Sequence, residues 1–550
     1  MRCAESRNSP DIPIFILMDW NPHHLSYRQT GYFSKIITDY LDRAGALAPF
    51  YEHPVSLEGI RASLEARMKS PVDRKTLVGA LREQYQSVDT VPSITANIDR
   101  LLDENTFTVC TAHQPAIFTG PLYFIYKIVH AIKLADRLTR DIPGKHFVPV
   151  FYMGSEDADL EELGNIHLNG EKLEWTTKQT GAVGRMNTKG LEKIIDRVEG
   201  ELAVQPYGAE LMERIKECYL KSPDIQTATF RLLHWLFAEY GLLVLIPDRA
   251  SLKRLMIPVF EDDLFQQTPC RIVEATIGRI PEQYKVQANP RPINLFYLQG
   301  DLRGRIEKIG DVYKVHESTL TFTPEAIREE LHAHPERFSP NVILRGLFQE
   351  TILPNIAFIG GGGETAYWLE LKDLFHHYGR PFPMLILRNS FLLVEKLWAG
   401  RAAHAGLAIE DLFRPEDVLL NELVKRESRQ QLSMEREIEV AERYYGALKE
   451  RARPVDPTLV QHVEAMQAKA LRPLREMEKK LLKAEKRKFV DQRRHIHTLR
   501  SALFPLDGLQ ERIDNFMPWY AAKGAAFIKD IYTYSPTLEQ EFVVLLEDHK

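Results

Sequence analysis

Five short apolar runs in this 550-residue chain each end in residues whose types could do chemistry. The runs, with the residues that follow them, are TFTVCTA with His113 and Gln114, FVPVFYM with residues 154–157, LLVLIP with Asp248, NIAFI with residues 360–363, and PMLIL with Arg388. A histidine or a tuned carboxylate can accept a proton near neutral pH, and the planar guanidinium group of an arginine matches a carboxylate. These residue types are therefore suited to binding a ligand's carboxylates and to deprotonating a reacting group.

The same apolar runs predict the elements that must position these residues. Nearly continuous apolar runs of this length are typical of strands that are covered on both faces, as in a parallel sheet. Helical patterns follow several of the runs and also fill residues 32–102. In an open α/β sheet, the loops beyond the carboxyl ends of the strands form the ligand crevice. We therefore predict that the polar residues after the five runs converge on one crevice.

The glycine-rich segment IAFIGGGGETAYWLEL resembles a nucleotide-binding turn. Gly361, Gly363 and Ala366 match the spacing G-x-G-x-x-A. A dinucleotide site would also need an acidic residue at the end of the next strand, where this chain has Arg388, which could still accept the 2′-phosphate of NADP. It would further need a second βαβ half, which the sequence after Ser390 does not provide. The pattern therefore argues against a conventional dinucleotide site, and the glycines would instead let another ligand approach the backbone.

After Arg388 the pattern changes to that of a coiled coil. Met434, Ile438, Ala441, Tyr445 and Leu448 alternate steps of four and three, and a second seam continues after the turn RPVDPTL. We predict an antiparallel helical arm, so that the fold class is α/β: a Rossmann-like parallel-sheet core with connecting insertions and a long antiparallel coiled-coil arm. The predicted parts are core segments 1–164, 241–270 and 341–392, connecting insertions 165–240 and 271–340, the coiled-coil arm 393–505, and a C-terminal segment 506–550 that packs back on the core.

Composition excludes several classes of protein. The formal net charge of −5 gives no basic field for nucleic acid, and no apolar run approaches the roughly 20 residues that span a bilayer. The four cysteines are scattered, and no histidine, cysteine or carboxylate set has metal-ligand spacing. We expect a soluble, cytoplasmic protein with no nucleic-acid or membrane partner and no protein-bound metal.

An ordered set of segments resembles the bacterial enzyme family that adds cysteine during bacillithiol biosynthesis. The segments are HQPAIFTGPLYFIYKIVHAIKLA, VPVFYMGSEDADLEEL, NLFY, PERFSPNVILRGLFQETILPNIAFIGGGGETAYWLELKDLF and LQERIDNFMPW, spread from His113 to Trp519. The chain departs from the usual pattern at His113, where glutamine is commoner, and in the glycine run, where the family commonly has a proline.

The resemblance implies a cysteine ligase that joins the carboxylate of L-cysteine to the amine of glucosaminyl-malate, giving the thiol bacillithiol. It also implies a homodimer formed through the coiled-coil arm. The family is distantly similar to class I aminoacyl-tRNA synthetases, but their His-x-Gly-His and Lys-Met-Ser-Lys-Ser segments are absent here. ATP and Mg²⁺ therefore stay open as candidate cofactors.

This chemistry assigns roles to the residues at the strand ends. His113 and Asp157 are the predicted catalytic residues, and the predicted substrate-binding residues are Gln114, Ser155, Glu156, Asp159, Asn341, Arg345, Gln349, Gly361, Gly362, Gly363, Glu364, Tyr367 and Arg388. His113 would deprotonate the amine, Arg345 and Arg388 would bind the malate carboxylates, and the acidic cluster would bind the cysteine ammonium group, sugar hydroxyls or Mg²⁺. Structural alternatives stay open for each: a satisfied histidine, a solvated acidic loop and interdomain salt bridges.

Two other functions also stay open. The first is a nucleotidyl- or aminoacyl-transferring enzyme, related to class I aminoacyl-tRNA synthetases, with another acceptor. The second makes the arm the functional surface and the α/β body a scaffold.

Overall fold

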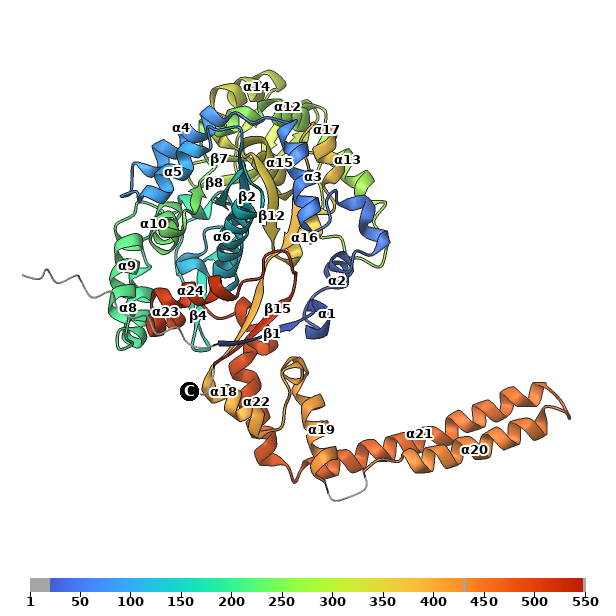
Figure 1. Cartoon of the computed structure of the whole chain (residues 1–550). Helices are drawn as coiled ribbons and strands as arrows, with labels where there is room; N and C mark the ends of the chain where they lie inside the picture. The colour runs from blue at the N-terminus through green and yellow to red at the C-terminus, as the bar shows by residue number, and fades with distance from the viewer. Residues whose placement is uncertain (1–19, 429–431, 548–550) are drawn as a thin grey trace, which may run out of the picture. The chain divides into compact units, whose positions relative to one another are not determined.

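The computed structural model describes residues 20–428 and 432–547, which divide into two compact units (Figure 1). The first unit contains the described residues up to Leu393 and those from Gly508 onward, and the second unit is Val394–Asp507. Within the described part of the chain, no helix has the length and apolar character needed to cross a membrane.

A five-stranded parallel sheet is the centre of the first unit, as the sequence predicted. In spatial order its strands are β13 (Met384–Leu387), β12 (Asn355–Gly360), β2 (Thr106–His113), β3 (His146–Met153) and β6 (Leu243–Leu245). All four pairings are parallel. The five apolar runs of the sequence thus became five neighbouring strands, and their carboxyl ends lie along one edge.

Both faces of this sheet are covered, which explains why its strands are apolar at successive positions. On one face, α3 (Leu57–Met68) and α6 (Tyr123–Asp141) pack against alternate strand residues such as Phe107 and Val109 in one buried cluster. On the other face, Phe358 of β12 stacks on Trp368, with ring centroids 4.5 Å apart. Trp368 ends the short helix α16 (Gly362–Trp368), so this aromatic contact fixes the glycine-rich turn above the sheet.

The segments between the sheet strands form additional layers. The helices before β2 are α1 (Tyr27–Thr30), α2 (Lys35–Leu41), α3, α4 (Arg74–Tyr85) and α5 (Pro92–Arg100). Residues 165–240 hold the hairpin β4 (Asn165–Leu168) and β5 (Glu171–Glu174), followed by α8 (Glu192–Leu202), α9 (Gly208–Leu220) and α10 (Ile225–Phe237). Between β6 and the next sheet lie α12 (Ile257–Phe265) and α13 (Thr268–Ile277).

Residues 295–340 form a second, antiparallel sheet. Its strands are β10 (Thr321–Phe322), β9 (Val312–Val315), β8 (Leu302–Ile309), β7 (Leu295–Gln299) and β11 (Phe338–Pro340), in spatial order. Directly after β11, Asn341 caps α15 (Val342–Ile352) by accepting the backbone N–H of Ile343 (2.9 Å). The antiparallel sheet therefore delivers Asn341 and α15 to the ends of the parallel strands.

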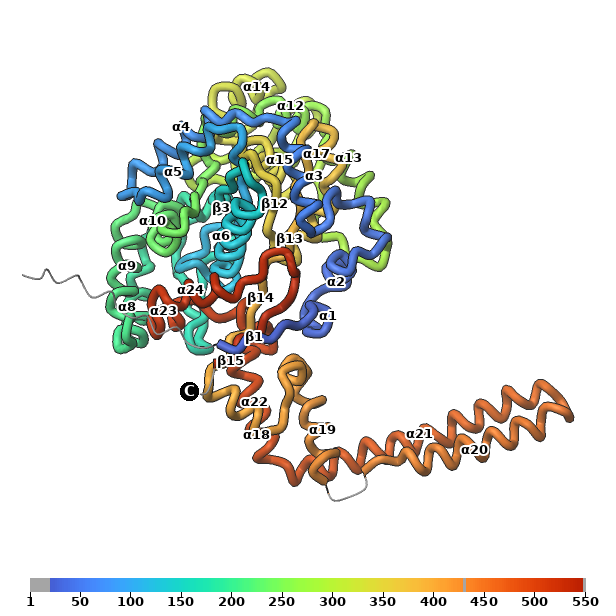
Figure 2. The backbone as a smooth tube through the Cα atoms, in the orientation of Figure 1, coloured from blue at the N-terminus to red at the C-terminus, as the bar shows by residue number. Residues whose placement is uncertain are grey.

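A third sheet was not expected from the sequence, which predicted helices directly after Ser390. Its strands are β1 (Trp20–Leu25), β15 (Phe542–Glu547) and β14 (Ser390–Val394), grouped in Figure 2. The N- and C-terminal strands β1 and β15 pair antiparallel, and α24 (Ala525–Tyr534) packs on α6. The end of the chain thus returns to the first unit.

The second unit is helical. Its helices are α18 (Lys396–His404), α19 (Glu416–Glu427), α20 (Glu435–Ala452), α21 (Thr458–Lys486) and α22 (Val490–Leu503). The helices α20 and α21 pair as a hairpin, and α21 continues through Pro473. No side chain of α20 is buried, and Val440, Tyr444 and Met477 are exposed. The hairpin alone therefore leaves apolar surface uncovered.

Candidate active site

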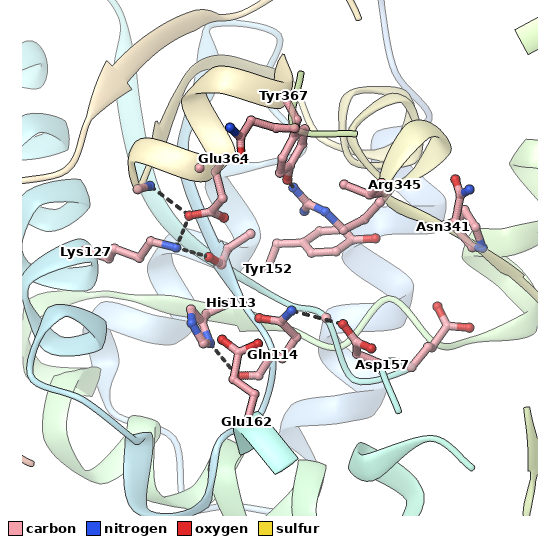
Figure 3. A pocket seen from close by; sticks show the side chains of 18 of the residues that line it. His113, Gln114, Lys127, Tyr152, Asp157, Glu162, Asn341, Arg345, Glu364 and Tyr367 are labelled. Carbon is pink, nitrogen blue, oxygen red and sulfur yellow. Dashed lines mark hydrogen bonds and ion pairs between the residues drawn. The ribbon is translucent and has the colours of Figure 1, made fainter. Parts of the chain in front are cut away.

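A cavity of about 570 Å³ lies at the carboxyl ends of the parallel strands (Figure 3). Each of the five strands provides a lining residue that lies at its end or just beyond it: His113, Gly154, Pro247, Gly361 and Arg388. Its size is that of a small-molecule site. The structure brings twelve of the predicted site residues to this cavity: His113, Gln114, Glu156, Asp157, Asn341, Arg345, Gly361, Gly362, Gly363, Glu364, Tyr367 and Arg388.

His113 is held on both ring nitrogens. Its Nδ1 lies 2.9 Å from the carbonyl oxygen of Gln114, and its Nε2 lies 3.0 Å from the hydroxyl of Tyr123. Because a carbonyl only accepts, Nδ1–H donates, and Nε2 accepts from Tyr123. Burial, together with the positive charge of Lys127, lowers the pKa of His113 to about 4. His113 is thus a neutral imidazole at physiological pH, with its lone pair already engaged.

A buried ion pair organises the glycine-rich turn. Lys127, from the second turn of α6, donates from Nζ to the carbonyl of Ala112 (2.8 Å) and to the carboxylate of Glu364. The same carboxylate accepts the backbone N–H of Gly361 (2.8 Å). Burial lowers the pKa of Lys127, whereas the attraction of Lys127 outweighs burial at Glu364 and keeps that carboxyl's pKa below its usual value. Glu364 thereby ties the turn to strand β2.

Arg388 lines the cavity but already has a carboxylate partner. Its guanidinium group donates to Glu511 (2.8 Å) and to Ser390 (3.1 Å), and the side chains of Arg388 and Glu511 are 6% and 0% exposed. Burial would lower the pKa of Arg388, but the charge of Glu511 outweighs it and raises the pKa. The positive charge of Arg388 is therefore largely compensated inside the protein.

Arg345 is presented to the cavity by aromatic side chains. It donates to the hydroxyl of Tyr367 (2.9 Å), and its guanidinium carbon lies 5.5 Å from the ring centroid of Tyr152 (Figure 3). Gln349 accepts a long hydrogen bond from the same guanidinium group (3.4 Å). Arg345 has no carboxylate partner among the residues described, so it retains its charge for a ligand.

The two acidic residues that follow β3, Glu156 and Asp157, have different surroundings. Asp157 accepts the side-chain amide of Gln114 (3.0 Å) and stays at the cavity. Glu156 reaches the lining but pairs with Lys253, which also donates to Asp248 (3.0 Å). Glu156 is thus held in a buried charge cluster, so Asp157 presents the less compensated carboxylate.

Three predicted substrate-binding residues lie outside the cavity lining. Ser155 is fully buried, and its carbonyl accepts the N–H of Gly184 (3.0 Å). Asp159 accepts the backbone N–H of Glu162 (3.0 Å) and caps the short helix α7 (Leu160–Leu163). Gln349 is fully buried beside Arg345. The side chains of Asp159 and Gln349 form local hydrogen bonds and the hydroxyl of Ser155 is buried, so none of the three lines the cavity.

Comparisons with known proteins agree with this arrangement. Residues 20–389 match the model of the bacillithiol biosynthesis BshC N-terminal Rossmann-like domain, and residues 391–547 match that of the BshC C-terminal coiled-coil domain. The chain belongs to the BshC family. The family resemblance and the fold class expected from the sequence are thereby confirmed.

Relatives in this family span the whole fold. A protein of Flavobacterium johnsoniae named "Putative cysteine ligase BshC" is 40% identical over 95% of this chain and 99% of its own length. A protein of the same name from Cytophaga hutchinsonii is 36% identical over 91% of this chain and 94% of its own length. A Campylobacter jejuni structure described as a putative arginyl-tRNA synthetase covers 80% of this chain and 98% of its own at 11% identity and a TM-score of 0.23, which carries no conclusion.

Sequence reasoning missed several charged and polar residues of this BshC-family cavity. They are Tyr123, Lys127, Tyr152, Glu162, Gln287, Arg303 and Arg512. Lys127 carried a usable signal, because a single lysine inside the apolar helix YFIYKIVHAI must find a buried partner. Arg303 and Arg512 carried none, since they come from the antiparallel sheet and from the C-terminal return of the chain.

Three of the missed side chains are charged and unpaired within the described structure. Glu162 is exposed, its carboxylate has neither a hydrogen bond nor an ion pair there, and partial burial with the nearby charges of Asp159 and Asp157 raises its pKa. The Nε of Arg303 is buried without a partner, and its guanidinium group lies over the ring of Phe296. Arg512 likewise has no carboxylate partner in the part of the chain that the structure describes. These groups are available to a ligand.

Proposed function

We propose that this BshC-family chain is a cysteine ligase that joins the carboxylate of L-cysteine to the amine of glucosaminyl-malate, forming bacillithiol. The observation that carries the proposal is the unpaired charge in the cavity: arginines for carboxylates and one carboxylate of raised pKa for an amine. The family to which the chain belongs supports the same reaction.

In this proposal the malate carboxylates bind to Arg303 and Arg345. A guanidinium group binds a carboxylate with two parallel hydrogen bonds, and Arg303 and Arg345 have no carboxylate partner among the described residues. Arg388, which the sequence suggested for this role, is matched by Glu511 and instead supports the strand end. Asn341 and Gln287 line the same cavity, and their side-chain amides can form hydrogen bonds to sugar hydroxyls.

The attacking amine must be neutral, so a group in the cavity must take its proton. We assign this role to Glu162, because a raised pKa brings a carboxylate closer to the pH at which it can exchange a proton with an amine. His113 has a pKa of about 4, and its Nε2 already accepts a hydrogen bond from Tyr123. Its proposed role is therefore to orient the Tyr123 side chain on the side of the cavity that holds Glu162. Asp157 stays a candidate for binding the amine or a hydroxyl.

Joining a free carboxylate to an amine needs an energy source, and ATP with Mg²⁺ is our proposal for it. The unpaired arginines suit a phosphate chain as well as a carboxylate. The described residues hold no group of three or more His, Cys, Asp or Glu side chains arranged to bind a metal ion. An Mg²⁺ ion would therefore be held by phosphate oxygens together with Asp157.

The test is to incubate the purified full chain with L-cysteine and glucosaminyl-malate, with and without ATP and Mg²⁺, and to detect bacillithiol by thiol labelling and chromatography. We expect product with the wild type and a large loss with Glu162→Gln. Glu161→Gln, a neighbouring acid outside the cavity lining, is the matched control. Absence of product under both conditions contradicts the proposal, and cysteine-dependent exchange of pyrophosphate into ATP that ignores the sugar would favour another acceptor.

We also propose that the arm forms a homodimer. The support is the uncovered apolar surface of the α20–α21 hairpin.

A further inference from the structure

A second, smaller cavity of about 210 Å³ adjoins the first. Its lining includes His113, Tyr123, Glu162 and Arg512, all four of which also line the main cavity. These four side chains, here called the shared wall, line both cavities where they adjoin, so the reacting ends of a ligand in each cavity would lie beside them.

The smaller cavity is built from three segments that are hydrogen-bonded to one another. The backbone N–H of Leu122 donates to the carbonyl of Asp514 (2.7 Å), and the side-chain amide of Asn515 donates to the carbonyls of Phe118 (2.9 Å) and Gly120 (2.6 Å). His167 of β4 forms an isolated parallel bridge with Asp514. These bonds fix the separation of the walls, so the cavity is a shaped compartment.

Its interior is small and combines apolar side chains with two polar ones, Asn165 and His167. Beyond the shared wall it is lined by Ala116, Pro121, Leu163, Asn165, Ile166, His167 and Ile513. Burial, together with the charge of Lys172, lowers the pKa of His167 and so disfavours its charged form. The charged side chains of this cavity, Glu162 and Arg512, are confined to the shared wall. The compartment therefore suits a short uncharged side chain, with the ligand's polar end at the wall.

The charged side chains that line each cavity indicate which substrate that cavity would bind. Lys127, Arg303, Arg345 and Arg388 line only the main cavity, which therefore suits the dicarboxylate conjugate. A cysteine side chain is small, and its thiol behaves as a weakly polar hydrophobe. With Arg512 at the wall, the cysteine carboxylate would face the compartment that holds the amine and Glu162.

We propose that the smaller cavity is the subsite for the amino acid, with its side chain among Ala116, Ile166 and Ile513 and its carboxylate at Arg512 on the shared wall. This inference rests on the proposed ligase function and adds the basis of selectivity for a side chain as short as that of cysteine. Because one extra methylene in an apolar pocket changes selectivity by roughly 10- to 200-fold, the walls of this cavity set the preference for cysteine over homocysteine.

Two substitutions test the subsite by size. Ala116→Leu fills the cavity and should raise the dissociation constant of L-cysteine at least about tenfold, while that of the sugar conjugate changes less than about twofold. Ile166→Ala enlarges it and should shift the preference toward homocysteine by roughly tenfold. Leu168→Ala is the matched control, because Leu168 lies two residues along β4, is equally buried and does not line the cavity.

The binding constants are measured by calorimetry on the full chain, with the other substrate present and ATP left out so that no product forms, and thermal unfolding checks that each variant is folded. The inference is overturned if the wild type does not bind cysteine, if Ala116→Leu weakens the conjugate and not cysteine, or if Ile166→Ala and Leu168→Ala change selectivity equally. Cysteine binding that responds to Ala116→Leu without formation of bacillithiol would sink the proposed function and leave the amino-acid subsite standing.

Discussion

Replacing Lys127 by methionine tests the ion pair on which the glycine-rich turn depends. The lysine side chain is 2% exposed and its partner Glu364 is 23% exposed. Removing one partner of a buried pair costs about 3–5 kcal/mol of unfolding free energy, because the other charge stays buried without compensation. Since Glu364 retains some contact with solvent, we expect the lower end, about 3 kcal/mol, including the lost bond to the carbonyl of Ala112.

The double variant Lys127→Met/Glu364→Gln should recover about 1–2 kcal/mol relative to Lys127→Met, because it no longer buries an unpaired carboxylate. The assay is urea unfolding of the full chain, followed by tryptophan fluorescence and extrapolated to water. Lys133→Met is the control on the same helix: among the described residues Lys133 has no ion pair, donates to the carbonyls of Tyr532 and Thr533 and lies over the Tyr532 ring, so its loss should cost less than that of Lys127. A loss below about 1 kcal/mol in Lys127→Met, or no recovery in the double variant, would refute the reasoning.

The pH dependence of the loss has a definite sign. In the wild type, Glu364 has a lowered pKa, so the pair stabilises the fold above the ordinary carboxyl pKa, and this contribution is lost as the pH falls. Without Lys127, burial is opposed mainly by the N–H of Gly361 and raises the pKa of Glu364, so the folded variant binds a proton more tightly than the unfolded chain. The cost of Lys127→Met should therefore be smaller at pH 5 than at pH 8.

Three further predictions concern activity and assembly. Glu162→Gln should lower kcat by roughly 10²–10⁴-fold. In a pH profile of product formation, wild-type kcat should fall with decreasing pH at a pKa above the ordinary carboxyl value. An unchanged profile in the variant would remove Glu162 from the proton transfer. Arg303→Gln should raise KM for the sugar conjugate about 10- to 100-fold with little change in KM for cysteine, and equal effects on both substrates would contradict the role of Arg303. Arg388→Gln should instead mainly lower the unfolding free energy, by about 3–5 kcal/mol, because it leaves the buried Glu511 carboxylate without its partner. Tyr444→Glu on the exposed face of α20 should reduce the mass measured by light scattering to that of a monomer without changing thermal stability, and an unchanged mass would take this face out of the interface.

Local patterns in the sequence were sufficient for the parallel sheet and for most of the cavity's rim. Each strand of that sheet is buried on both faces, so it appears in the sequence as a short continuous apolar run, and its carboxyl end is marked by the first polar or glycine residues. His113, residues 361–363 and Arg388 could be placed on this basis alone. The third sheet could not, because β1 pairs with β15 at the other end of the chain.

Only the tertiary structure decided which charged side chains have a partner of opposite charge. Arg388 and Glu511 are 123 residues apart, and Lys127 and Glu364 are 237 apart, yet each pair is in contact. A sequence pattern reports residue types and local spacing, whereas the charge and pKa of a side chain depend on burial and on partners brought in by the fold. For this reason the sequence by itself determined the chemistry available at the strand ends, whereas the fold left Glu162, Arg303, Arg345 and Arg512 without a partner of opposite charge among the described residues.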